Sequence, residues 1–172
     1  MKLRTLLSTF VALASLSLFA KAEPLAVGAP APEITATNQD GKPVDFKEVY
    51  AKGPTLVYFY PKADTPGCTK QGCSIRDSWE DLKKAGIQVL GVSEDSVDAQ
   101  KAFAGKYNLP HTLIADADGK VAAAFQVDMK GTRTTRQSFL IKDGKVVWTM
   151  LKATTETHAK DVLTAYEGLS KK

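Results

Sequence analysis

Two cysteines, Cys68 and Cys73, carry the most reactive side chains of this 172-residue sequence. Residues 61–67, with two prolines and a glycine, predict a loop that delivers Cys68 to the start of a helix. There the sulfur meets unpaired backbone N–H groups and the positive end of the helix dipole. Both favour the thiolate, which is the nucleophile that can attack an O–O bond. The position of Cys68 therefore predicts thiolate chemistry.

The five-residue spacing of the cysteines predicts a conformational change. On one helix they stand roughly 140° apart around the axis, with Cα atoms roughly 8–9 Å apart. A disulfide needs Cα atoms within about 7 Å, so the helix and a Cys68–Cys73 bond exclude each other. Bond formation therefore requires the first turns to unwind, which argues against a structural disulfide. Gly72 lies in this stretch. Because glycine weakens a helix by about 1 kcal/mol relative to alanine, we hypothesise that Gly72 eases the opening.

The elements around the cysteines must hold them in place. Residues 56–60 are all apolar or aromatic, which predicts a strand buried on both faces. After the loop, apolar residues recur at helical spacing among charged ones and end at Gly86. These apolar residues are Ile75, Trp79 and Leu82.

The rest of the chain alternates strand and helix patterns, which predicts an α/β fold with a central mixed sheet and helices on both faces. Further strands are predicted over 87–92, 112–115, 138–141 and 146–150, and helices over 95–107, 121–125 and 156–169. An N-terminal β-hairpin is predicted around the turn 39–41, and a second hairpin around 142–145.

The first 22 residues predict a signal peptide. A basic start, an apolar run over 6–20 and the sequence Ala20-Lys21-Ala22 are typical of a secretory leader cut after Ala22. Residues 23–172 would then form a single exported domain, and the periplasm is the expected compartment. Cleavage removes three positive charges and no acid, so the net charge falls from +4 to +1. This balance gives no electrostatic case for binding nucleic acid or, after cleavage, a membrane.

The motifs around the cysteines resemble those of the peroxiredoxin Q (bacterioferritin comigratory protein) group. Pro61, Thr65 and Cys68 form the pattern Pro-x3-Thr-x2-Cys, which is typical of peroxiredoxins, and Cys-x4-Cys is typical of this group. Segments 58–61, 73–77, 92–95, 109–113 and 136–141 also match in order, so the resemblance covers nearly all of residues 23–172.

The resemblance implies a thioredoxin-like fold and a thiol-dependent peroxidase. Cys68 would be the peroxidatic cysteine, oxidised to a sulfenic acid, and Cys73 would condense with it to an intramolecular disulfide. A hydroperoxide is the implied substrate, and a thioredoxin-like protein is the implied reductant. No cofactor or metal is implied, and an intramolecular disulfide needs no dimer, so a monomer is expected.

The resemblance also implies roles for the residues around the sulfur. Thr65 would hold the peroxide oxygen, Pro61 would shape and dry the pocket, and the N–H groups of Gly67 and Cys68 would donate to the peroxide. Arg136 would stabilise the thiolate and polarise the peroxide, with Arg133 as a second candidate for this part. Such fixed donors would meet the negative charge that spreads over the reacting atoms.

Other interpretations of these residues stay open. A thiol–disulfide oxidoreductase is the main alternative, although its usual Cys-x-x-Cys motif is absent. A copper-handling or other metal-binding module is a third, but the spacing of Cys68, Cys73, His111 and His158 matches no standard zinc pattern. We expect His111 to be structural, and Asp64 to face the solvent, because beside the sulfur it would oppose ionisation.

Overall fold

The computed structural model describes residues 23–171. The predicted signal peptide, residues 1–22, lies outside the described residues. Within the described part of the chain, no helix is both long and apolar enough to cross a bilayer.

One mixed sheet of seven strands forms the centre of the molecule, in the order β2-β1-β5-β4-β3-β8-β9. The central strand β3 (Thr55–Phe59) pairs in parallel with β4 (Gln88–Ser93) and antiparallel with β8 (Ser138–Lys142). The other strands are β1 (Thr35–Asn38), β2 (Pro43–Asp45), β5 (Thr112–Ala115) and β9 (Lys145–Met150). The predicted mixed sheet and both predicted hairpins are thereby confirmed.

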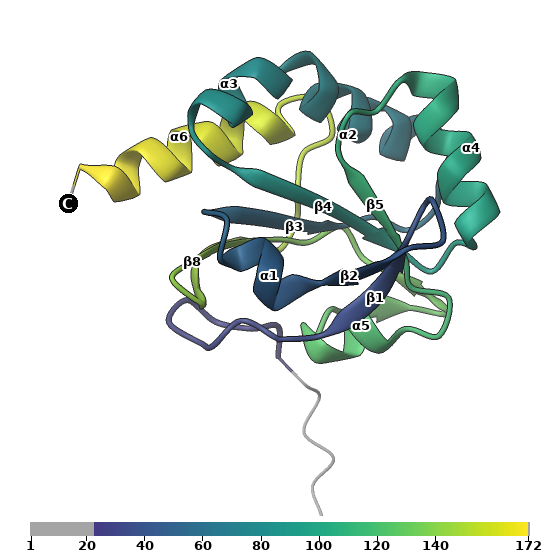
Figure 1. The fold of residues 1–172 in the computed structure, drawn as a ribbon, viewed down its shortest axis with the longest axis horizontal. Helices are drawn as coiled ribbons and strands as arrows, with labels where there is room; N and C mark the ends of the chain where they lie inside the picture. Colours follow the sequence, from purple (N-terminus) through teal and green to yellow (C-terminus); the bar gives the residue numbers. More distant parts are fainter. Residues whose placement is uncertain (1–22, 172) are drawn as a thin grey trace, which may run out of the picture.

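Helices cover both faces of this sheet, as the sequence pattern predicts (Figure 1). One face packs against α2 (Pro66–Asp77), α3 (Trp79–Lys84), α4 (Val97–Tyr107) and α6 (His158–Ser170). The other packs against α1 (Phe46–Tyr50) and α5 (Lys120–Ala124).

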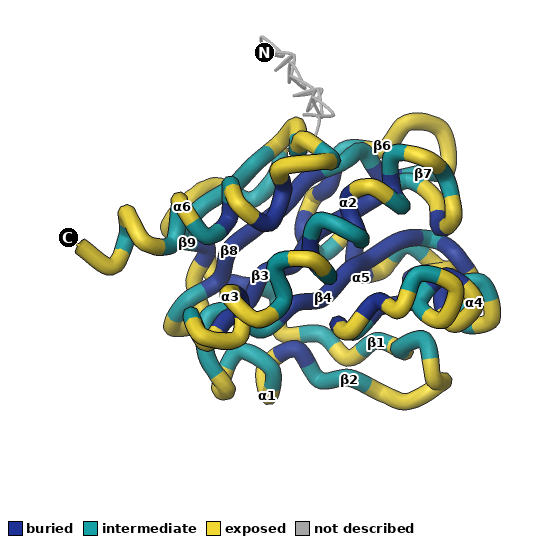
Figure 2. The backbone as a smooth tube through the Cα atoms, turned by 90° about the horizontal axis from the view of Figure 1, so that it is seen from above, coloured by how far each residue is buried: buried dark blue, intermediate teal, exposed yellow. Residues whose placement is uncertain are grey.

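Strand β3 divides the core into two halves because its side chains alternate between the two faces. Tyr58 points to the side of α2 and α4, whereas Val57 and Phe59 point to the side of α5. Every residue of β3 is buried, and Figure 2 shows the same for most of the neighbouring strand β4. Each fully buried aliphatic or aromatic side chain contributes roughly 1.5–3 kcal/mol. The strand that leads to Cys68 is therefore a firm base for the loop after it.

The structure differs from the sequence prediction at three places. The helix predicted from Cys68 to Gly86 is two helices, because the backbone of Ser78 leaves the helical conformation at ψ 15°. Serine competes for local backbone hydrogen bonds and is a common helix boundary. The short helix α1 and a two-stranded hairpin of β6 (Met129–Lys130) and β7 (Arg133–Thr134) were not predicted. Strands of two residues are too short to show a period.

Candidate active site around Cys68

Cys68 lies in the first turn of α2, as predicted, and is only 2% exposed. Thr65 is the N-cap residue with extended backbone, and Pro66 begins the helix. Proline suits this position because its φ is already helical and its missing N–H would have no helical partner. The chain thus turns from β3 through the loop into α2 and leaves the sulfur beside the free N–H groups of the helix start.

Arg136 reaches Cys68 from the segment before β8. Its Nη1 and Nη2 atoms each lie 3.5 Å from the sulfur. Gly67 makes room for this approach, since a Cβ atom there would lie 3.1 Å from Nη2. The guanidinium thus places a positive charge beside the sulfur. The structure therefore brings together three of the predicted site residues, Cys68, Gly67 and Arg136.

Arg133, the second candidate for the arginine role, is engaged elsewhere. Its Nη1 donates to Asp95 Oδ1 at 3.0 Å, in an ion pair whose carboxylate side is 8% exposed. The geometry therefore favours Arg136 as the arginine beside the sulfur.

A buried polar chain holds Arg136 from behind. Gln71 Oε1 accepts a hydrogen bond from Arg136 Nη1 at 2.6 Å, and Gln71 Nε2 lies 3.3 Å from His158 Nδ1. An amide nitrogen only donates, so His158 accepts at Nδ1 and carries its proton on Nε2, 2.8 Å from Ser138 Oγ. Burial is the main cause of a His158 pKa lowered to about 4; Asp161 opposes this shift and Arg136 adds to it. Neutral His158 thus serves as a fixed acceptor.

Sequence reasoning missed Gln71, His158 and Ser138 as members of the site. Gln71 and His158 are 87 residues apart, and His158 and Ser138 are 20 apart. No local motif joins them, because only the packing of α6 against α2 and β8 brings them together.

Thr65 is oriented by its own loop. Its hydroxyl donates to the Lys62 carbonyl at 2.9 Å, which leaves the lone pairs of the hydroxyl oxygen free to accept. Pro61 begins the same loop and is half-buried. Both residues therefore lie on the loop that leads to the sulfur, as the sequence pattern predicts.

Cys73 shares α2 with Cys68, and both cysteines are free thiols. Cys68 is buried, whereas Cys73 is partly exposed. Between them, Gly72 is packed closely: a Cβ there would lie 3.2 Å and 3.4 Å from the two terminal carbons of Leu109. This glycine therefore also allows α2 to approach the chain after α4, a role that the sequence hypothesis did not include.

Asp64 turns its charge away from the sulfur, as expected. Its carboxylate accepts from Lys106 Nζ at 2.8 Å and from Tyr107 Oη at 2.6 Å, and its side chain is 45% exposed. These hydrogen bonds lower the pKa of Asp64. The one acidic side chain of the loop is thus neutralised by α4 instead of opposing a thiolate.

His111 is a core residue, as expected. Its Nε2 lies 2.8 Å from Tyr58 Oη. Burial, with a smaller contribution from His158, lowers its pKa to about 3. A neutral, buried imidazole of this kind supports packing.

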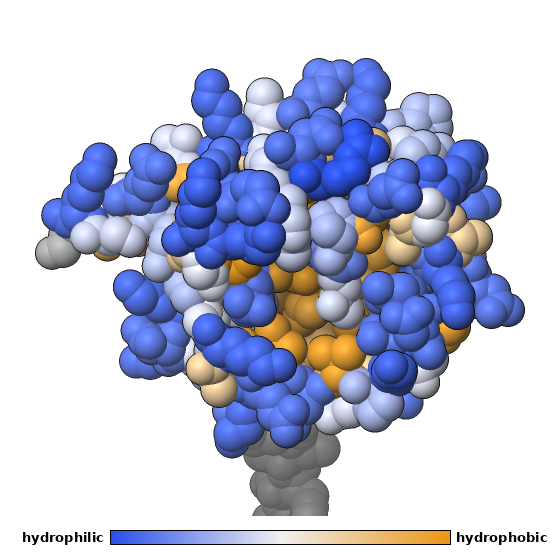
Figure 3. All heavy atoms as spheres, turned by 45° about the horizontal axis from the view of Figure 1, so that its top comes forward, coloured by the Kyte–Doolittle hydropathy of each residue, from blue (hydrophilic) through white to orange (hydrophobic). Residues whose placement is uncertain are grey.

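The surface has hollows away from the cysteine site. Figure 3 shows an apolar hollow among hydrophilic side chains on one face of the molecule. Three surface hollows of about 340–470 Å³ are lined by residues that do not include Cys68 or the predicted site residues. The cysteine site itself is marked by the polar contacts at the start of α2.

The sheet order, the helices on both faces and the cysteine in the first turn of α2 define a thioredoxin-like fold that carries a thiol site. The model of the AhpC/TSA family matches residues 27–149, and the chain belongs to this family.

Named relatives agree with the motifs. The chain is 46% identical over 136 residues to the chloroplastic peroxiredoxin Q of Gentiana triflora, covering 77% of this chain and 61% of that protein. It thus spans less than two thirds of the length of that relative. The crystal structure of peroxidoxin BcpB from Mycobacterium tuberculosis matches with a TM-score of 0.78 and 30% identity, covering 83% of this chain and 97% of that one.

A bacterioferritin comigratory protein from Xanthomonas campestris, described for its alkyl peroxide reduction activity, has a TM-score of 0.77 and 27% identity. That match covers 84% of this chain and 99% of the other. The resemblance to the peroxiredoxin Q group and the predicted thioredoxin-like fold are therefore confirmed.

Proposed function

We propose that this protein is a thiol-dependent peroxidase that reduces hydroperoxides through Cys68. The observation that carries this proposal is the approach of both Arg136 terminal nitrogens to the buried sulfur in the first turn of α2. Helix N–H groups and a guanidinium stabilise negative charge as it spreads from sulfur to oxygen. The named relatives support the same chemistry.

In the first step, the Cys68 thiolate attacks one peroxide oxygen. The S–O bond forms, the O–O bond breaks, and the leaving hydroxide or alkoxide takes up a proton to give water or an alcohol. Arg136 and the N–H groups of Gly67 and Cys68 meet the developing charge. The Thr65 oxygen accepts from the hydroperoxide O–H, and Pro61 keeps water from the sulfur.

In the second step, the Cys73 thiol condenses with the Cys68 sulfenic acid. The S–S bond forms, the S–O bond breaks, and water leaves. Because both residues lie on α2, the helix must open before the sulfurs can meet. An external dithiol then reduces the disulfide and restores the helix.

The reductant and the compartment follow from the predicted leader. We infer that an exported, periplasmic protein would take electrons from a thioredoxin-like partner outside the cytosol. Wild-type turnover in the absence of any added dithiol source would contradict this part of the proposal.

The direct test mixes the reduced protein with one equivalent of hydrogen peroxide and follows the loss of free thiols. We expect wild type to lose two thiols quickly, Cys73→Ser to stop at a sulfenic acid, and Cys68→Ser to be inert. Reaction of wild type no faster than an ordinary free thiol would overturn the proposal. Faster reduction of insulin disulfides than of peroxide would favour the thiol–disulfide oxidoreductase instead.

A further inference from the structure

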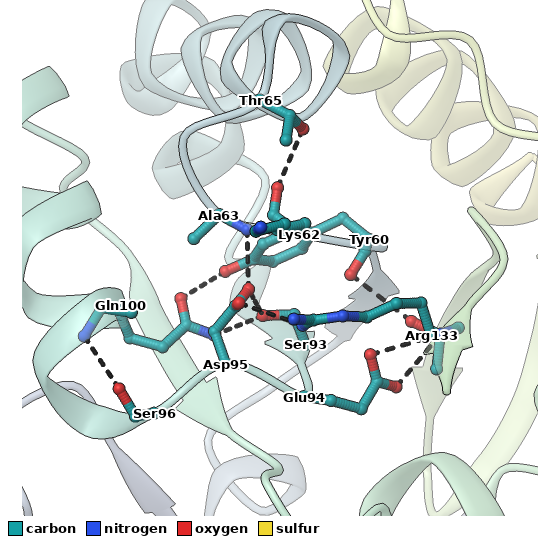
Figure 4. Close-up of polar contacts among 12 residues, drawn as sticks. Tyr60, Lys62, Ala63, Thr65, Ser93, Glu94, Asp95, Ser96, Gln100 and Arg133 are labelled. Atoms are coloured by element: carbon teal, nitrogen blue, oxygen red, sulfur yellow. Dashed lines mark hydrogen bonds and ion pairs between the residues drawn. The ribbon is translucent and has the colours of Figure 1, made fainter. Parts of the chain in front are cut away.

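Asp95 is a buried carboxylate that joins two parts of the site. It lies just after β4 and is 7% exposed. Its Oδ2 accepts from the backbone N–H of Ala63 at 2.6 Å and from Ser93 Oγ at 2.8 Å, while its Oδ1 accepts from Arg133 Nη1 at 3.0 Å (Figure 4). Both oxygens are therefore in use, each toward a different segment of the chain.

The first segment is the loop that carries Pro61 and Thr65. Ala63 lies midway between them, so its bond to Asp95 ties the middle of the loop to the residue just after β4. The Thr65 hydroxyl bonds to the carbonyl of Lys62, the residue just before Ala63. The placement of the Thr65 oxygen thus depends on the backbone that Asp95 holds.

The second segment is β7, which leads into Arg136. Arg133 and Thr134 form this strand, and the Thr134 hydroxyl donates to the Tyr60 carbonyl at 3.4 Å. Arg136 follows two residues after the strand. The ion pair of Asp95 with Arg133 therefore holds the base of the segment from which Arg136 reaches the sulfur.

Neighbouring side chains keep Asp95 itself in place. Ser93 Oγ, which donates to Asp95, accepts from Gln100 Nε2 at 2.8 Å, and Gln100 Oε1 accepts from Tyr60 Oη (Figure 4). Ser93 and Gln100 are fully buried. The carboxylate is thus anchored on side chains of β4 and α4.

We propose that Asp95 is a positioning residue that sets the distance between Thr65 and Arg136 around Cys68; this rests on the proposed peroxidase function. Its two oxygens connect the Thr65 loop to the Arg136 segment, so one carboxylate holds the backbone of both peroxide-binding groups. Asp95 bonds to Ala63, Ser93 and Arg133 and acts on the site through them. Its effect is on the geometry of the transition state, where a misplacement of about 1 Å can cost roughly 100-fold in rate.

Asp95→Asn tests this role because an amide has only one acceptor oxygen. The variant can satisfy the Ala63 side or the Arg133 side, but not both. The matched control is Asp98→Asn, which removes an equal charge three residues away from an exposed position. Arg133→Gln breaks only the second connection.

Two rates are measured for Cys68 in a Cys73→Ser background: sulfenic acid formation with hydrogen peroxide, and alkylation by iodoacetamide. Alkylation needs the thiolate but not the hydrogen bonds that hold the two peroxide oxygens in line with the sulfur. We expect Asp95→Asn to lower the peroxide rate by about 10–100-fold and the alkylation rate by less than about threefold. Arg133→Gln should lower the peroxide rate less, and Asp98→Asn should leave both rates unchanged.

The outcomes separate the two proposals. A folded Asp95→Asn protein with an unchanged peroxide rate, or with both rates reduced equally, overturns the positioning role. If Asp95→Asn fails to fold, Arg133→Gln decides in the same way, because Arg133 is partly exposed and its loss leaves Asp95 bonded to Ala63 and Ser93. A wild-type peroxide rate no higher than that of free cysteine overturns the peroxidase function itself.

Discussion

Arg136 and Cys68, which are 68 residues apart in the sequence, meet through both terminal nitrogens of the guanidinium at 3.5 Å from the sulfur. The contact depends on three neighbours: Gly67 leaves the space, Gln71 holds Nη1 at 2.6 Å, and buried His158 holds Gln71. The guanidinium therefore has one defined position, and a fixed charge needs no reorganisation when the reaction begins.

The first prediction concerns this guanidinium. Arg136→Gln removes a charged donor, so we expect the rate of peroxide reduction to fall by about 100–1,000-fold. Arg136→Lys should recover only part of the rate, since lysine is a point charge without the planar fork. Stopped-flow measurement of sulfenic acid formation in the Cys73→Ser background checks both. An Arg136→Lys rate equal to that of wild type would show that the two-nitrogen geometry is unimportant.

The Thr65 hydroxyl is the subject of the second prediction. Because it donates to the Lys62 carbonyl, its oxygen is left to accept from the hydroperoxide. Thr65→Val keeps the shape but loses the acceptor, and we expect a loss of about 10–100-fold in the peroxide rate. Thr65→Ser should keep most of the rate, and Thr69→Val on the next turn is the matched control. An unchanged Thr65→Val rate would remove Thr65 from the mechanism.

The pH dependence of stability should reflect the two buried histidines. Burial lowers the pKa of His158 to about 4 and that of His111 to about 3, below their ordinary value of 6.5. Above pH 6.5 both are neutral whether folded or unfolded. As the pH falls from 6.5 toward 4, only the unfolded chain takes up these protons, so the free energy of unfolding decreases by up to about 1.4 kcal/mol per pH unit for each histidine.

Urea unfolding between pH 7.5 and 5 measures this slope. His158→Gln should reduce it by one proton, and comparison with wild type cancels the carboxylates that titrate in the same range. If the two proteins show parallel slopes, His158 is not neutral in the folded state.

Gly72 gives the fourth prediction. The sequence hypothesis is that this glycine eases the opening of α2, and the structure adds that its bare Cα packs against Leu109. Gly72→Ala should leave sulfenic acid formation nearly unchanged and slow the loss of the second thiol. The double variant with Leu109→Ala separates the two effects, since it removes the contact at 3.2 Å. Disulfide formation as fast as in wild type would refute the hypothesis.

The sequence predicts most of the fold because the long elements carry clear patterns. The apolar run within strand β3 and the turns at Asp40 and Asp143 are visible in the local sequence. The pattern Pro61, Thr65 and Cys68 likewise lies within eight residues. What local patterns could not predict is the support of the site. The bonds from Gln71 to His158 and from Asp95 to Ala63 join residues 87 and 32 positions apart, and they exist only once the helices have packed.

Contacts along helix α2 hold it closed, and they determine how long the sulfenic acid of Cys68 persists before the disulfide can form. Lys70 pairs with Glu156, Ser74 Oγ accepts from the Ala159 N–H, and Arg76 donates to the Tyr107 carbonyl. Until these contacts release, a sulfenic acid at Cys68 waits beside Arg136, where a second peroxide can carry it to the irreversible sulfinic acid. The ratio of sulfinic acid to disulfide, measured at increasing peroxide concentration, reports this delay. Ser74→Ala removes one of the contacts and should lower the ratio. The contacts that hold α2 in the conformation that positions Cys68 therefore also limit the peroxide concentration at which the protein stays active.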